Sequence, residues 1–171
     1  MKKITILIII TFLSISLQAR DILKTYNFKD SNEKNVELQT MSGGVYFPGL
    51  KGKVVLLAFF GKDCPPCIAE IPGFVKIQKE YGKNFQIVSM HVQQKMSKSE
   101  LNNFITLHKI NYIVIPTSKK VFDFSNFITQ KTGWGGQIPY SILFDKEGNA
   151  IKTYLGRQPE ATLIKDIKSL L

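Results

Sequence analysis

The two cysteines of this sequence stand in one four-residue segment, Cys64-Pro65-Pro66-Cys67. A thiolate attacks a disulfide, and a second thiol close by can resolve the mixed disulfide that forms. As a structural cross-link the pair would do little, because the chain-entropy model gives about 2 kcal/mol for so small a ring, against about 3 kcal/mol for a ring of fifteen residues. The spacing therefore predicts a redox-active dithiol.

The segments on either side of the cysteines indicate how their reactivity is set. Residues 54–60 form a continuous apolar run, typical of a strand buried on both faces. From 65 to 81 apolar residues recur mostly at spacings of three and four, which predicts a helix that begins at the cysteines and ends at Gly82. The unpaired N–H groups at the start of this helix would stabilise a thiolate on Cys64. We therefore predict that Cys64 is the exposed nucleophile and Cys67 the buried resolving thiol.

The neighbours of the cysteines modify this expectation. Pro65 and Pro66 occupy first-turn positions, where a missing N–H costs nothing and a fixed φ stiffens the motif. The charge of Lys62 favours a thiolate on Cys64, and the charge of Asp63 opposes it.

Metal binding is the main alternative use of two thiols. A structural zinc site needs four ligands, and the two histidines, His91 and His108, are 17 residues apart rather than three to five. We therefore expect no metal site and no cofactor, and we assign neither histidine a role. A copper- or haem-handling protein that uses the thiols as ligands stays open as an alternative.

The rest of the chain alternates expected strands and helices, which predicts a mixed α/β sheet. Short runs of β-formers at 25–28 and 35–38 indicate a hairpin, and the glycine-rich stretch 41–53 indicates a connecting loop. Ser97 and Glu100 form a capping box ahead of a helix that runs to about residue 108. The other expected elements are strands at 85–92, 112–115, 140–144 and 150–155, and helices at 121–132 and from Pro159 and Glu160 onward.

Length and composition favour one domain. The chain has 171 residues, of which 44% are hydrophobic, enough for one sizeable core. Its formal net charge is +10, but the lysines are scattered singly and in pairs. This pattern favours a solvated basic surface and no nucleic-acid partner.

The N-terminus has the three parts of a secretory signal: Lys2 and Lys3, an apolar run at 4–17, and Ala19 before the charged Arg20. The apolar segment is shorter than the roughly 20 residues that a membrane-crossing helix needs. We therefore predict that residues 1–19 are a cleaved signal, with a retained inner-membrane anchor as the alternative. Export to the periplasm would place both cysteines where disulfides persist.

Two segments together resemble a known family. The stretch 52–72, with its strand and Cys-Pro-Pro-Cys motif, is similar to the active-site region of exported TlpA/ResA-like thioredoxins. The segment 138–145, with Gly148, resembles the cis-proline strand and hairpin of that family. The resemblance covers roughly residues 50–171. For residues 20–171 it implies a thioredoxin-like domain: a central mixed β-sheet with helices on both faces, an N-terminal β-hairpin and a βα insertion.

The same resemblance implies a thiol:disulfide oxidoreductase, usually a reductase of protein disulfides, with some members in cytochrome c maturation. The expected partners are protein disulfides, apocytochrome c among them, and a membrane thiol carrier of the DsbD or CcdA type as electron donor. The expected state is a monomer. The motif alone does not fix the direction, because about 150 mV separates thioredoxin from strong oxidants that share the fold. A disulfide oxidase or isomerase is therefore the alternative.

The sequence departs from the family pattern at two positions. Asp63 stands where the family usually has Trp, and Ala58 stands where cytoplasmic thioredoxins bury an Asp. Glu70, three residues after Cys67, matches the glutamate of the ResA-type motif and is the candidate to handle the proton of that thiol. The alternative for Glu70 is an ordinary solvated side chain on the helix surface.

The remaining candidate residues would contact substrate. The resemblance makes Pro139 a cis-proline opposite the cysteines, where the backbone at Ile138 pairs with an extended substrate. Pro65 and Pro66 would line the same surface. Trp134, in the loop that leads to Pro139, belongs either to a substrate-facing apolar patch or to the core.

Overall fold

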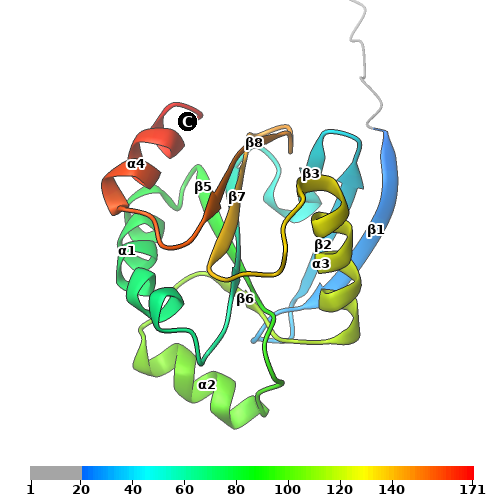
Figure 1. The fold of residues 1–171 in the computed structure, drawn as a ribbon. Coiled ribbons are helices and arrows are strands. Elements are labelled where there is room, and N and C mark those ends of the chain that lie inside the picture. The colour runs from blue at the N-terminus through cyan, green and yellow to red at the C-terminus, as the bar shows by residue number, and fades with distance from the viewer. Residues whose placement is uncertain (1–20) are drawn as a thin grey trace, which may run out of the picture.

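The computed structural model describes residues 21–171 (Figure 1). Its centre is a five-stranded sheet made of β4 (Val54–Phe60), β5 (Phe85–His91), β6 (Ile113–Ile115), β7 (Tyr140–Phe144) and β8 (Ala150–Leu155). The strand order is β6-β5-β4-β7-β8. Parallel pairing joins β4 to β5 and β5 to β6, whereas β7 runs antiparallel to both β4 and β8. The mixed sheet expected from the sequence is confirmed.

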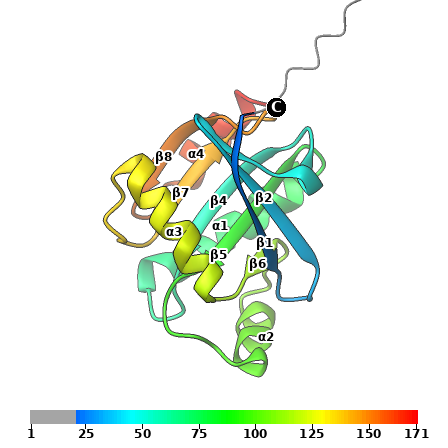
Figure 2. The same cartoon turned by 90° about the vertical axis from the view of Figure 1, so that its right-hand side faces the viewer.

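Helices cover both faces of this sheet (Figures 1 and 2). They are α1 (Pro65–Tyr81), α2 (Lys98–Leu107), α3 (Lys119–Thr132) and α4 (Glu160–Lys168). On one face lie α1 and α4, and on the other lies α3. Helix α2 lies at the end of the sheet where α1 begins.

Strand β4 is central because every one of its seven residues is apolar and buried. Alternate side chains point to opposite faces of a strand. Val55, Leu57 and Phe59 enter the core under α3, and Leu56 and Ala58 enter the core under α1 and α4. A strand buried on both faces carries the continuous apolar run seen in the sequence.

A second, three-stranded antiparallel sheet precedes the main one and packs beside α3 (Figure 2). It consists of β1 (Ile22–Lys29), β2 (Asn35–Met41) and β3 (Gly44–Tyr46). The first two strands form the expected hairpin, with Phe28 paired to Val36. Phe28 also meets the ring of Phe124 of α3 edge-on at 6.0 Å, so the hairpin joins the main core.

The prediction of a loop over residues 41–53 was partly wrong. Gly44–Tyr46 pairs with β2, and Pro48–Leu50 forms a short 3-10 helix. A Cβ on Gly44 would lie 2.0 Å from the carbonyl oxygen of Gly148, so a glycine here permits two backbones to approach. One of the glycines that indicated a loop, Gly44, instead marks a close contact within the fold.

The helix boundaries follow from side-chain caps. Ser97 and Glu100 make both hydrogen bonds of the expected capping box, at 3.2 and 2.7 Å. Helix α3 begins two residues before the expected position, because the Ser118 hydroxyl accepts from the Val121 N–H and serves as its N-cap. Helix α1 spans the predicted residues and is followed by Gly82.

The signal predicted at residues 1–19 lies outside the described residues. Between residues 21 and 171, no helix is both long and apolar enough to cross a membrane.

Candidate functional site

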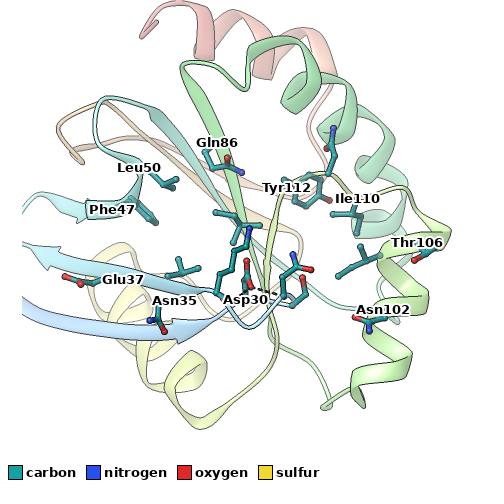
Figure 3. Close-up of a pocket in the computed structure, with 18 residues that line it drawn as sticks. Asp30, Asn35, Glu37, Phe47, Leu50, Gln86, Asn102, Thr106, Ile110 and Tyr112 are labelled. Atoms are coloured by element: carbon teal, nitrogen blue, oxygen red, sulfur yellow. Dashed lines mark hydrogen bonds between the residues drawn. The ribbon is translucent and has the colours of Figure 1, made fainter.

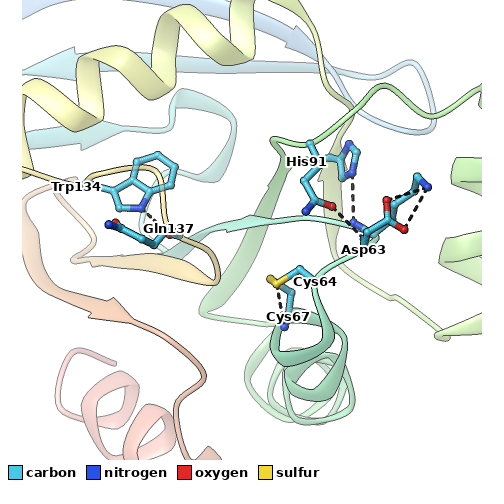
Figure 4. The surroundings of a disulfide bond; sticks show 8 residues. Asp63, Cys64, Cys67, His91, Trp134 and Gln137 are labelled. Atoms are coloured by element: carbon cyan, nitrogen blue, oxygen red, sulfur yellow. Dashed lines mark hydrogen bonds and ion pairs between the residues drawn. A yellow bond between two sulfur atoms is a disulfide. The ribbon is translucent and has the colours of Figure 1, made fainter.

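Cys64 and Cys67 form a disulfide at the start of α1 (Figure 4). Cys64 is the N-cap of the helix, and its sulfur accepts a hydrogen bond from the Cys67 N–H at 3.3 Å. Cys64 is 6% exposed and Cys67 is 1% exposed. The order of exposure agrees with a nucleophilic Cys64, but in the oxidised form this sulfur is far less open than the sequence suggested.

The charges beside Cys64 largely offset each other. The Lys62 ammonium lies 3.1 Å from the Asp63 carboxylate on the protein surface. Paired and exposed to water, the two charges act on the sulfur as a weak dipole. The first turn of α1 therefore contributes most to the stabilisation of a thiolate at Cys64.

Glu70 lies one helical turn beyond Cys67 and is only 9% exposed, which excludes the solvated alternative. Burial raises the pKa of its carboxyl from 4.5 to about 8, and the charge of Arg157 opposes this rise. At neutral pH the carboxyl of this oxidised form is therefore mostly protonated. A protonated carboxyl near a buried sulfur can give up a proton when that sulfur becomes a thiolate.

The sequence did not point to the groups that surround Glu70. Arg157, from the loop between β8 and α4, lines a small hollow with Glu70 and Pro72. Tyr112 lies just before β6, and burial raises the pKa of its phenol, as does the charge of Glu70, whereas a hydrogen bond with Ser89 opposes the rise. These residues come from distant parts of the chain, so no local spacing in the sequence connects them with the cysteines.

The peptide bond between Ile138 and Pro139 is cis, as the resemblance implied. It precedes β7, whose first residue, Tyr140, pairs with Phe59 of β4. The Ile138 side chain packs against the cluster that contains both cysteines. Pro65 and Pro66 are exposed beside the disulfide. Three of the residues predicted to contact substrate thus lie around the sulfur pair.

Trp134 is a core residue. It is 6% exposed, its ring stacks on Tyr140 at 4.9 Å, and it lies 4.6 Å from the ring of Phe59. Its Nε1–H donates to the Gln137 carbonyl at 2.7 Å, and Figure 4 shows it apart from the disulfide. This position favours the packing alternative over the substrate-facing one. The tryptophan supports the loop that leads to Ile138 and Pro139.

Two hollows that lie outside this constellation border α2. The larger, of about 760 Å³, lies between the β1–β2 turn, α2 and β6, with Asp30, Asn102 and Tyr112 on its walls (Figure 3). Neither cysteine nor Glu70 lines it. The second, of about 620 Å³, is lined by Lys62, Met96, Phe104 and Leu107 and adjoins the loop before Cys64.

Among residues 21–171, no group of three or more His, Cys, Asp or Glu side chains is placed to hold a metal ion. The two histidines also lie in different settings. His91 is fully buried at the end of β5, and His108 caps the end of α2.

A disulfide at the start of a helix that follows a central strand of a mixed sheet, with a cis-proline just before the neighbouring antiparallel strand, defines a thioredoxin-type redox protein. The family model described as "AhpC/TSA family" matches residues 21–166. The chain therefore belongs to the AhpC/TSA family, within which its relatives are thioredoxin-like.

Curated relatives agree with this placement. The chain is 28% identical over 145 residues to "Thiol-disulfide oxidoreductase ResA" of Bacillus subtilis (strain 168), which covers 84% of this chain and 70% of the relative. It is 26% identical over 123 residues to the protein of the same name from Bacillus thuringiensis (strain Al Hakam), covering 71% of this chain and 65% of that relative. The match to the second relative thus spans just under two thirds of that protein's length.

A solved structure shows the same fold. The thiol:disulfide interchange protein of the thioredoxin family from Chlorobium tepidum TLS superposes with a TM-score of 0.69 at 23% identity. The alignment covers 89% of this chain and 97% of that protein.

Proposed function

We propose that this protein is an exported thiol:disulfide oxidoreductase that reduces protein disulfides through the Cys64/Cys67 pair. The observation that carries the proposal is the Cys64–Cys67 disulfide at the first turn of α1, with the buried carboxyl of Glu70 one turn behind it. The relatives named as thiol-disulfide oxidoreductases support the same class of reaction.

In the oxidative half of the proposed cycle, the Cys64 thiolate attacks one sulfur of a substrate disulfide. The other substrate sulfur leaves as a thiolate and takes a proton from water. The Cys67 thiol then transfers its proton to Glu70, which the preceding reductive half leaves as a carboxylate, and attacks the Cys64 sulfur. The substrate sulfur that was bound to Cys64 leaves as a thiolate, so the substrate has gained two electrons and the enzyme holds a disulfide.

In the reductive half, a dithiol donor attacks the Cys64 sulfur, and Cys67 leaves as a thiolate. The Glu70 carboxyl, protonated at neutral pH because of its raised pKa, returns the proton to Cys67. The second thiol of the donor then attacks the donor sulfur that is bound to Cys64. This step closes the disulfide of the donor and releases the Cys64 thiolate. One carboxyl thus takes and returns the proton of the buried thiol, where water has little access.

The substrate would bind in an extended conformation beside Ile138 and Pro139, against the exposed rings of Pro65 and Pro66. The secretory pattern of residues 1–19 supports export to the periplasm, with a retained anchor as the alternative. In that compartment a membrane carrier of the DsbD or CcdA type would supply electrons, and apocytochrome c is a candidate substrate. Neither a metal nor another cofactor enters the cycle, and the protein would act as a monomer without nucleic acid.

The reduction potential of the Cys64/Cys67 couple, measured against glutathione, tests the proposed direction. A reductase should have a potential close to that of thioredoxin, about −270 mV, and should be mainly reduced in the exporting cell. A potential near −120 mV with a steady-state disulfide would make the protein an oxidase. Assays for bound zinc, copper and haem on the reduced protein test the ligand-handling alternative.

A further inference from the structure

The loop that leads from β4 into Cys64 is held by the segment that follows β5. Residues 61–63 form the loop, and residues 91–93 run alongside it (Figure 4). At the end of β4 the Val92 N–H donates to the Phe60 carbonyl at 3.0 Å. Two further hydrogen bonds reach the loop itself: the Lys62 N–H donates to His91 Nε2 at 3.4 Å, and the Asp63 N–H donates to Gln93 Oε1 at 3.0 Å.

The His91 ring is fully buried, and both of its nitrogens are used. Because Nε2 accepts from the Lys62 N–H, the proton of the neutral ring must lie on Nδ1. That nitrogen donates to the Thr117 hydroxyl oxygen at 2.5 Å. The Thr117 hydroxyl in turn is within donating distance of the carbonyls of His91, at 2.8 Å, and Gln93, at 3.0 Å. Thr117 therefore fixes both the tautomer and the orientation of the imidazole.

The second side-chain contact depends on Gly61. A Cβ at this position would lie 2.1 Å from both Cδ and Oε1 of Gln93. Only a residue without a side chain lets the Gln93 amide lie across the loop and reach the Asp63 N–H.

The imidazole stays an acceptor over the pH range of thiol chemistry. Burial lowers the pKa of His91 to about 4, the charge of Lys62 lowers it further, and the charge of Asp63 opposes this. The other groups that face the ring carry no charge: Phe60 presents its ring at 5.3 Å, and Thr117 presents its hydroxyl.

We propose that His91, oriented by Thr117 and assisted by Gln93, is a positioning residue for Cys64. It holds the backbone of the preceding loop so that the Cys64 sulfur stays at the first turn of α1, where the Cys67 N–H donates to it. Without this contact the sulfur can move away from the helix end, so the thiol pKa rises and attack on a disulfide slows. The inference requires only thiol–disulfide exchange at Cys64 and holds for either direction of electron flow.

Two substitutions at this position separate the two ring contacts. His91→Gln places an amide oxygen near the position of Nε2, so it keeps an acceptor for Lys62. His91→Asn places its amide near the position of Nδ1, so it keeps only the contact with Thr117. His108→Gln removes the other histidine of the described chain and serves as the control.

The measurements are the Cys64 thiol pKa, from thiolate absorbance, and the rate at which the reduced full-length protein reacts with oxidised glutathione. At pH 7 the Asn variant should react about three- to tenfold more slowly, with a raised Cys64 pKa, as expected for the loss of one hydrogen bond. The Gln variant and the His108 control should stay within about twofold of the wild type. Gln93→Ala should shift both quantities in the same direction as His91→Asn.

The pH dependence of the exchange rate is a second test, because a general loss of packing would not change it. Below about pH 4, the pKa of His91, the ring is mostly protonated and can no longer accept from Lys62. The rate per Cys64 thiolate should therefore fall in the wild type and stay flat in the Gln variant. The proposal is overturned if His91→Asn and Gln93→Ala both leave the Cys64 pKa and the exchange rate at wild-type values. It is also overturned if the wild-type and Gln profiles coincide below about pH 4.

Discussion

The backbone N–H of Cys67 donates to the sulfur of Cys64 at 3.3 Å, which gives the two cysteines unequal chemistry. The Cys64 sulfur lies at the N-terminus of α1 and accepts from the Cys67 N–H, because Pro65 and Pro66 have no N–H to donate, whereas the Cys67 side chain lies one turn inside the helix and is 1% exposed. A negative charge is therefore stabilised on Cys64 and not on Cys67.

Cys67→Ser should accordingly trap mixed disulfides with substrate proteins, because attack by Cys64 proceeds and resolution does not. Cys64→Ser should trap at least about tenfold fewer, since the remaining thiol is buried and lacks the helix end. Non-reducing electrophoresis of exported extracts, with the double serine variant as control, gives the comparison. Equal trapping by the two single variants would contradict the assignment.

Glu70 should make the oxidised protein less stable as the pH rises from about 4.5 to 8. Its pKa is about 8 in the folded chain, so in this range the native state holds a proton that the unfolded state has released. The free energy of unfolding then falls by at most about 1.4 kcal/mol per pH unit, and the fall ends above pH 8. Below pH 4.5 both states are protonated and the effect vanishes.

Denaturant unfolding of the oxidised protein at pH 5, 7 and 9 measures this slope. Glu70→Gln should flatten it, because the amide is neutral throughout, and Glu80→Gln, on the exposed side of the same helix, should leave it unchanged. In the reduced protein, Glu70→Gln should lower the Cys67 thiol pKa and slow resolution of the mixed disulfide. If the free energy of unfolding changed with pH equally in the wild type, Glu70→Gln and Glu80→Gln, a group other than Glu70 would be the one that titrates.

Local pattern was enough for most of the fold. The apolar run at 54–60 could only be a strand covered on both faces, and the Ser97–Glu100 box fixed the start of α2. The third strand of the hairpin sheet could not be predicted in this way. Its first residue, Gly44, is a glycine because Gly148 approaches it from a hairpin about a hundred residues later, and a local pattern does not contain that contact.

The residues of the candidate site also divide into those that the sequence predicted and those that only the folded structure brings together. The cysteines and Glu70 share one helix, so their spacing predicted their proximity, and the resemblance indicated the cis bond at Pro139. His91 acts from the last position of β5 and Arg157 acts from the loop after β8, and neither belongs to a motif. A buried histidine with both nitrogens bonded is visible only after the chain has folded.

Trp134→Phe should affect stability much more than catalysis. The change removes the Nε1–H that donates to the Gln137 carbonyl and leaves a partly buried acceptor without its partner, at a cost of about 1–3 kcal/mol. Stacking on Tyr140 should largely survive, and the disulfide is not touched. Denaturant midpoints should fall while the KM for a protein disulfide stays the same. A raised KM with an unchanged denaturant midpoint would instead show that Trp134 belongs to the substrate-binding surface.

Leu107 offers the opposite test, because its side chain is 76% exposed on the hollow shared with Met96 and Phe104. Leu107→Asn removes apolar surface next to the loop that precedes Cys64, and at an exposed site it should change the free energy of unfolding by no more than about 0.5 kcal/mol. If extended substrates rest on this hollow, the KM for an apolar peptide disulfide should rise by up to about tenfold, since full burial of one leucine is worth about 1.5 kcal/mol or more. The rate with oxidised glutathione, which has no large apolar side chain to bury against Leu107, should not change. Ile151→Asn, at an exposed position on β8, is the matched control and should leave both rates unaltered. A Leu107 variant that reduces peptide and glutathione disulfides at wild-type rates would show that substrates approach Cys64 from the Ile138 side alone.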